Sequence, residues 1–70
     1  MMTEKRNFIF KDMLCSYGVY VHKEKTYSMV DVVINDGKDC CDFQIISKED
    51  ADSLIRAFKD IIDILEKEYE

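Results

Sequence analysis

The chain has 70 residues, of which 47% are hydrophobic and 36% charged, and it carries a net charge of −5. A chain of this length makes a single domain, which buries only about 60% of the surface of its unfolded state and is marginally stable without a disulfide, a metal or a partner chain. The acidic balance disfavours binding to nucleic-acid phosphates and favours a basic protein surface as the partner.

The first apolar run is Asn-Phe-Ile-Phe at residues 7–10. It follows a polar stretch, residues 1–6, that we expect to be disordered. The run predicts either a fourth strand at a sheet edge or an extended arm, residues 1–13, that covers one face of the sheet with Phe8 and Phe10. The sequence leaves this choice open.

Three further strands are predicted at about residues 14–22, 26–35 and 39–46, because these segments are rich in β-branched and aromatic residues that alternate with polar ones. The pair Asp36-Gly37 favours a two-residue type I′ hairpin turn, which needs φ > 0 at both positions. A two-residue loop at Glu24-Lys25 is expected to join the two earlier strands.

These two loops predict the pairing of the strands. The first places Val30 opposite Phe43 and Val32 opposite Cys41, so that apolar residues meet apolar residues. A slip of one residue would send the two apolar sets to opposite faces, which argues against a three-residue loop. The second loop places Val19 opposite Val30.

The last third of the chain predicts a long helix at about residues 48–69. Ser47 can accept a hydrogen bond at the helix start, and Glu49 and Asp50 lie in the first turn, where the dipole favours negative charge. One apolar stripe lies within roughly 60° of Phe58. It consists of Ala51, Leu54, Ile55, Phe58, Ile61, Ile62, Leu65 and Tyr69. The expected fold is therefore α+β, a three- or four-stranded antiparallel β-meander with this helix packed on one face.

The face of the sheet that points away from the helix is more apolar than an unused solvent face requires. Its candidate residues for partner binding or self-association are Tyr20, Tyr27, Met29, Asp31 and Asp42. We expect a homodimer through this face or an edge strand, unless the N-terminal arm covers it. The predicted register puts Asp31 directly opposite Asp42, a docking point for a basic side chain rather than a metal site, because only His22 lies near.

One flank of the helix is acidic. Its candidate partner-binding residues, at roughly 80–140° from Phe58, are Asp52, Asp63, Glu66 and Glu70. A row of carboxylates on a helix can imitate a phosphate strand and steer association with a basic groove. The alternative is a solvent-exposed helix face with intrahelical pairs of opposite charge, such as Asp52–Arg56 and Asp63–Lys67.

No catalytic, cofactor or metal motif is present, and we do not expect an enzyme. The cysteines Cys15, Cys40 and Cys41 are odd in number and lack the spacing of a zinc site or a disulfide framework. With no apolar run long enough to span a membrane, the protein is expected to be cytoplasmic.

In overall form, the chain resembles the small acidic inhibitors of phages and other mobile elements, anti-CRISPR proteins among them. The shared features are its length, Lys/Glu-rich composition, short sheet, single helix and exposed acids. The resemblance implies a stoichiometric inhibitor that occupies a basic, nucleic-acid-binding surface. A second similarity, carried by residues 45–50 at the entry to the helix, is to dimeric single-strand-binding coactivators. In that alternative, nucleic acid lies on the sheet face that carries Tyr20 and Tyr27. Asp31 and Asp42 count against it, because they stand on this face where such a protein needs basic side chains.

Overall fold

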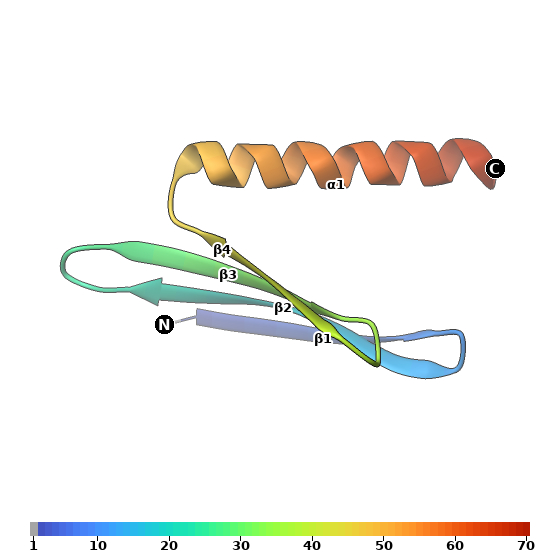
Figure 1. The fold of residues 1–70 in the computed structure, drawn as a ribbon, viewed down its shortest axis with the longest axis horizontal. Helices are drawn as coiled ribbons and strands as arrows, with labels where there is room; N and C mark the ends of the chain where they lie inside the picture. The colour runs from blue at the N-terminus through green and yellow to red at the C-terminus, as the bar shows by residue number, and fades with distance from the viewer. Residues whose placement is uncertain (1) are drawn as a thin grey trace.

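The computed structural model describes residues 2–70, with side chains from residue 4 onward. Four strands precede one helix: β1 (Met2–Phe10), β2 (Met13–Lys23), β3 (Ser28–Asn35), β4 (Cys40–Ile45) and α1 (Lys48–Glu68). The strands form one antiparallel sheet in the order β1-β2-β3-β4, and α1 lies along one face of it (Figure 1). The expected α+β meander with a C-terminal helix is confirmed.

Strand β1 decides between the two alternatives for the N-terminal segment. It pairs with β2 over its whole length, from Met2 opposite Val21 to Phe10 opposite Met13. The segment is thus a fourth strand and not a covering arm, and the disorder expected for residues 1–6 is wrong from Met2 onward; Met1 lies outside the described residues. The cause is a tight turn at Lys11-Asp12.

Both residues of that turn have positive φ, 51° for Lys11 and 63° for Asp12. A two-residue turn of this kind matches the right-handed twist of the flanking strands, which lets β1 and β2 stay paired to the end. Lys-Asp is not a preferred pair for such a turn, so the sequence signal was weak.

The pairing of β3 with β4 is shifted by two residues from the prediction. Val30 lies opposite Ile45 and Val32 opposite Phe43. The loop has four residues because the Asp36 carboxylate accepts hydrogen bonds from the N–H groups of Lys38 and Asp39, both at 2.9 Å. These bonds offer the backbone an alternative to the expected two-residue turn.

The β2–β3 pairing is also shifted by two residues, with Val19 opposite Val32. Its loop is closed by the Glu24 N–H, which donates to the Tyr27 carbonyl at 2.8 Å. A shift of two residues leaves every side chain on its predicted face, because side chains alternate with a period of two. The apolar residues therefore still face the helix, and we call this side the inner sheet face.

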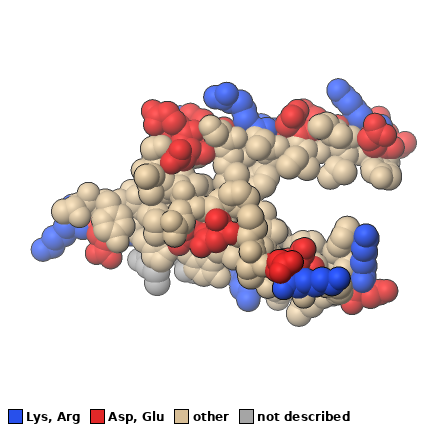
Figure 2. Space-filling model, in the orientation of Figure 1, with Lys and Arg blue, Asp and Glu red and all other residues tan. Residues whose placement is uncertain are grey.

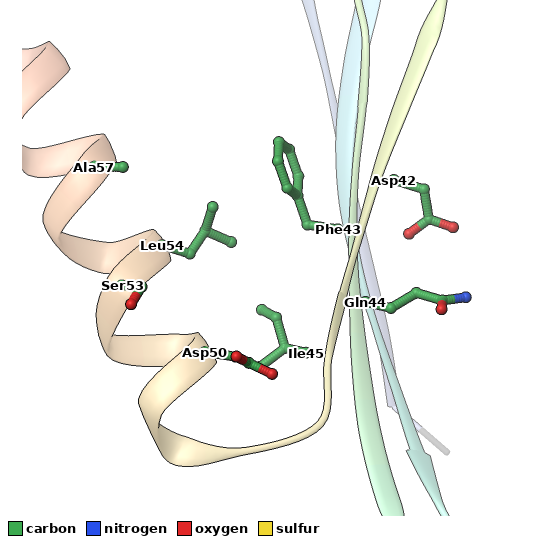
Figure 3. A pocket seen from close by; sticks show the side chains of 8 residues that line it. All are labelled: Asp42, Phe43, Gln44, Ile45, Asp50, Ser53, Leu54 and Ala57. Carbon is green, nitrogen blue, oxygen red and sulfur yellow. The ribbon is translucent and has the colours of Figure 1, made fainter.

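Helix α1 begins as predicted, with the Ser47 hydroxyl accepting from the Asp50 N–H at 3.2 Å. Of the strands, only β4 lies close to it. In Figure 3, Phe43 and Ile45 point toward Leu54 of the helix, while Asp42 and Gln44 point away. The first three turns of the helix are thereby attached to one edge of the sheet.

The core formed by this contact is small. Among the described residues, Cys15 is the one fully buried hydrophobic side chain, with 1% of its surface exposed, and α1 buries none of its residues. Helix and sheet separate toward the C-terminus, leaving an open space between them (Figure 2). The predicted stripe exists, but only its N-terminal half reaches the sheet.

Candidate interaction surfaces

The acidic flank consists of Asp52, Asp63 and Glu66 on α1 and of Glu70, which lies two residues beyond the helix end at Glu68. It is exposed to solvent except at Asp52, which is partly buried. Asp52 is also partly neutralised, since its carboxylate lies 3.0 Å from the Lys48 ammonium on the same flank. The alternative pairs Asp52–Arg56 and Asp63–Lys67 do not form. Within the described residues the close pairs of oppositely chargeable side chains are Lys48–Asp52 and His22–Asp31, of which the second is an ion pair only with a protonated His22.

The remaining acids of the flank lie toward the C-terminal end of the helix. Asp63, Glu66 and Glu70 are exposed and make no ion pair with another described residue. Acidic atoms recur along the helix to its end (Figure 2). Three carboxylates are therefore free to meet a cation from outside the chain.

The outer sheet face, the side that points away from α1, contains four of the five residues proposed for it. Tyr20, Met29, Asp31 and Asp42 lie on this face, since they alternate with the inner residues of their strands. Tyr27 does not: it is 57% exposed in the β2–β3 loop, where its carbonyl closes the turn.

The predicted juxtaposition of Asp31 and Asp42 is wrong. Asp31 lies opposite Gln44 and Asp42 opposite Val33, because the β3–β4 register is displaced by two residues. The two carboxylates are diagonal neighbours and form no paired site.

Asp31 instead contacts His22, whose Nε2 lies 3.2 Å from the Asp31 Oδ2. The other Asp31 oxygen, Oδ1, is buried without a hydrogen-bond partner in the described residues. Tyr20 lies directly opposite Asp31 and its ring lies over Gly18, where an added Cβ would stand 3.2 Å from the Tyr20 Cε2. The centre of the outer face is thus one tyrosine ring beside a histidine–carboxylate pair.

Side chains that could bind a metal are scattered through the described part of the chain. No group of three or more His, Cys, Asp or Glu residues there could hold a metal ion. Cys40 and Cys41 are free and exposed, and the buried Cys15 thiol donates to the Met13 carbonyl at 3.6 Å. Nor is the described helix long and apolar enough to cross a membrane.

A third surface was not predicted. On the sheet side it contains Phe8, Phe10 and Tyr17, which are 40%, 56% and 48% exposed. On the helix side it contains Ile62 and Leu65, which are 52% and 53% exposed. Both sets lie on sides that were expected to pack together, and we call the space between them the apolar opening.

Element lengths were the one sequence signal for this opening. Helix α1, with 21 residues, is about 32 Å long, whereas β4, the six-residue strand that it contacts, spans about 20 Å. Residues 46 and 47 alone connect β4 to α1, so the helix start is held at the strand end. A straight helix then leaves a twisted sheet after a few turns.

The chain was compared with protein-family models, with curated proteins and with solved structures. None of them matches it. The three surfaces described above are therefore the features from which a function can be inferred.

Proposed function

We propose that the protein is a small acidic binding module that acts by stoichiometric binding rather than catalysis. Its partner is a protein with a basic, nucleic-acid-binding surface, which the module occupies and thereby inhibits. The observation that carries this proposal is the exposed row Asp63, Glu66 and Glu70, which has no ion pair within the described residues. A cytoplasmic location belongs to the same proposal.

The position of these acids argues against a role in helix stability. Carboxylates are unfavourable near the C-terminal end of a helix, where the dipole is negative, by a few tenths of a kcal/mol each. Glu66 and Glu68 nevertheless lie in the last turns of α1, with Lys67 as the one base there. If these residues served only to keep the helix surface solvated, basic residues at this end would stabilise the helix more.

The spacing of the acids suits a surface that binds phosphates. Asp63 and Glu66 follow one another at about 4.5 Å along the helix axis, and Glu70 lies two residues beyond the end of the helix at Glu68. The spacing of Asp63 and Glu66 is of the same order as the 3.4 Å axial rise between phosphates of one DNA strand. The helix holds Asp63 and Glu66 in place, and Glu70 follows its C-cap residue Tyr69, so a basic groove meets carboxylates that are largely fixed by the helix.

The experiment compares two triple variants with equal changes in charge. In the first, Asp63→Asn, Glu66→Gln and Glu70→Gln neutralise the flank. In the control, Glu49→Gln, Asp60→Asn and Glu68→Gln neutralise three acids on other sides of the same helix. Both variants are expected to fold, because all six side chains are exposed.

Partners captured by the unaltered chain from the cells it comes from are then measured with each variant. A partner of the proposed kind associates more slowly with the flank variant, while the control variant retains the on-rate and its steep decrease with salt. The captured protein must also lose nucleic-acid binding when one equivalent of the module is added. Equal loss in both variants would mean that overall charge, and not the flank, drives binding.

A second candidate function is single-stranded nucleic-acid binding by the outer sheet face. The observation in its favour is the Tyr20 ring, which lies over Gly18 as an aromatic platform on a four-stranded sheet. Asp31, directly opposite Tyr20, counts against it. Titration of labelled single-stranded DNA at low ionic strength separates the candidates: tight binding that is lost in Tyr20→Ala favours the second, and no binding favours the first.

A further inference from the structure

The apolar opening leaves the chain with far more surface than a compact monomer. Its accessible surface is 6228 Å², whereas a folded monomer of 8.3 kDa has about 4,600 Å². Its radius of gyration is 14.2 Å, against about 11 Å for a compact chain of 70 residues. The excess surface of about 1,600 Å² per chain is of the size that an obligate homodimer buries.

We propose that a second copy of this chain fills the opening. The two α1 helices pack antiparallel through the C-terminal halves of their stripes, around a two-fold axis near Ile62, and each covers the exposed aromatic end of the other copy's sheet. This interface is separate from the outer sheet face and does not rest on the proposed basic partner. It engages Glu66 and leaves Asp63 and Glu70 of the acidic flank free for that partner.

The stripe is suited to such a symmetric contact. Within roughly 60° of Phe58 it carries no charged residue, so two acidic helices can approach without burying a carboxylate. An antiparallel pairing centred on Ile62 sets Phe58 beside Leu65 of the second copy, and the reverse contact follows by symmetry. The helix dipoles also oppose each other in this arrangement.

Charge at the edge of the stripe agrees with the same pairing. Lys59 and Glu66 lie on one flank, at roughly 100° and 80° from Phe58. In the antiparallel register each Lys59 faces Glu66 of the second copy, which gives two opposite-charge contacts per dimer. A parallel pairing would place like residues together, and this would set the acids of the last turn against one another.

The small core of the isolated chain favours a second copy, and not a transiently bound partner, as the occupant of the apolar opening. With Cys15 as the one fully buried hydrophobic side chain of the described residues, the isolated chain has little core. A domain of this size needs a further contribution to stability, and a second copy is present wherever the chain is made.

The test begins with the unaltered chain. Sedimentation equilibrium is expected to give twice the 8.3 kDa chain mass. The melting temperature should rise with protein concentration, because dissociation accompanies unfolding. A monomer at about 100 μM, with a melting temperature independent of concentration, overturns the proposal.

Two matched variants then locate the interface. Leu65 and Ile64 are 53% and 54% exposed in the single chain, but only Leu65 lies on the stripe. Leu65→Glu should raise the dimer dissociation constant about a hundredfold or more, because it buries an unpaired charge in the interface, whereas Ile64→Glu should leave it within about threefold. A dimer that tolerates both changes equally forms elsewhere and overturns the proposal.

A charge swap tests the antiparallel register without disturbing the stripe. Lys59→Glu should raise the dissociation constant about tenfold, and the double change Lys59→Glu with Glu66→Lys should restore it. Because both residues are exposed, neither change should prevent folding. A double variant that associates no better than Lys59→Glu alone contradicts the proposed pairing.

Discussion

Phe43 on β4 and Phe58 on α1 meet edge to face, with ring centroids 6.3 Å apart and ring planes at 86°. This pair marks the point at which the helix leaves the sheet, since every residue of α1 after Phe58 is exposed. The orientation of a helix of 21 residues is thus determined by contacts in its first three turns.

The aromatic pair predicts a measurable coupling. Phe43→Ala and Phe58→Ala should each lower the free energy of unfolding by about 2–3 kcal/mol, less than the 3–5 kcal/mol of a fully buried phenylalanine, because both rings are partly exposed. The double variant should lose about 0.5–1.5 kcal/mol less than the sum. Urea unfolding at one protein concentration measures this. Phe10→Ala, at the far end of the sheet, should be additive with Phe58→Ala.

Substitutions in the β1–β2 turn should increase the stability of the protein. Lys11 and Asp12 both adopt positive φ, which costs residues other than glycine about 1–2 kcal/mol each. Lys11→Asn with Asp12→Gly supplies the preferred residues and should raise the free energy of unfolding by about 1 kcal/mol. The same pair placed at Lys25 and Thr26, where no residue has positive φ, should give no gain in thermal or urea denaturation.

Gly37 should resist substitution for two separate reasons. Its φ is +95°, and an added Cβ would collide with the Met13 side chain. Gly37→Ala is therefore expected to lower the free energy of unfolding by about 2–3 kcal/mol. In a Met13→Ala background the contact with the Met13 Cε disappears and only the contact with the Cβ of residue 13, at 3.2 Å, remains. A cost of about 1–2 kcal/mol should then remain, mainly from the backbone. An equal cost in both backgrounds would show that Met13 moves aside freely.

Asp36 should contribute a pH dependence at low pH. Hydrogen bonds from the N–H groups of Asp39 and Lys38 lower its pKa below the usual 3.8. Because the folded-state pKa is the lower one, the stability from this carboxylate is present above pH 3.8 and is lost as the pH falls through the lowered pKa.

Asp36→Asn keeps an acceptor but cannot ionise, so its unfolding free energy should fall less steeply below pH 4 than that of the unaltered chain. Asp36→Ala removes the acceptor at every pH and should be less stable throughout the titration. Carbon chemical shifts of the Asp36 carboxyl group would give the midpoint directly. A midpoint at or above 3.8 would contradict the assignment.

The sequence by itself determined the helix, the three later strands and the face of each residue in those strands. Alternation in residues 14–46 gave the three later strands, and Ser47 with the stripe around Phe58 gave the helix. These features are local, because a side-chain period of two or 3.6 is written into consecutive residues. The faces survived even where the register was wrong, since both errors were shifts of two residues.

Tertiary structure decided the register, the place of the N-terminal segment and the reach of the helix. The Asp36 hydrogen bonds lengthened a loop that composition alone had predicted to be shorter, and this separated Asp31 from Asp42. The independent shift of the β2–β3 register brought Asp31 beside His22. The exposed ends of the sheet and helix depend on how a straight helix leaves a twisted sheet. No local pattern encodes that angle, because the Phe43–Phe58 contact joins elements whose relative direction is set by the whole sheet.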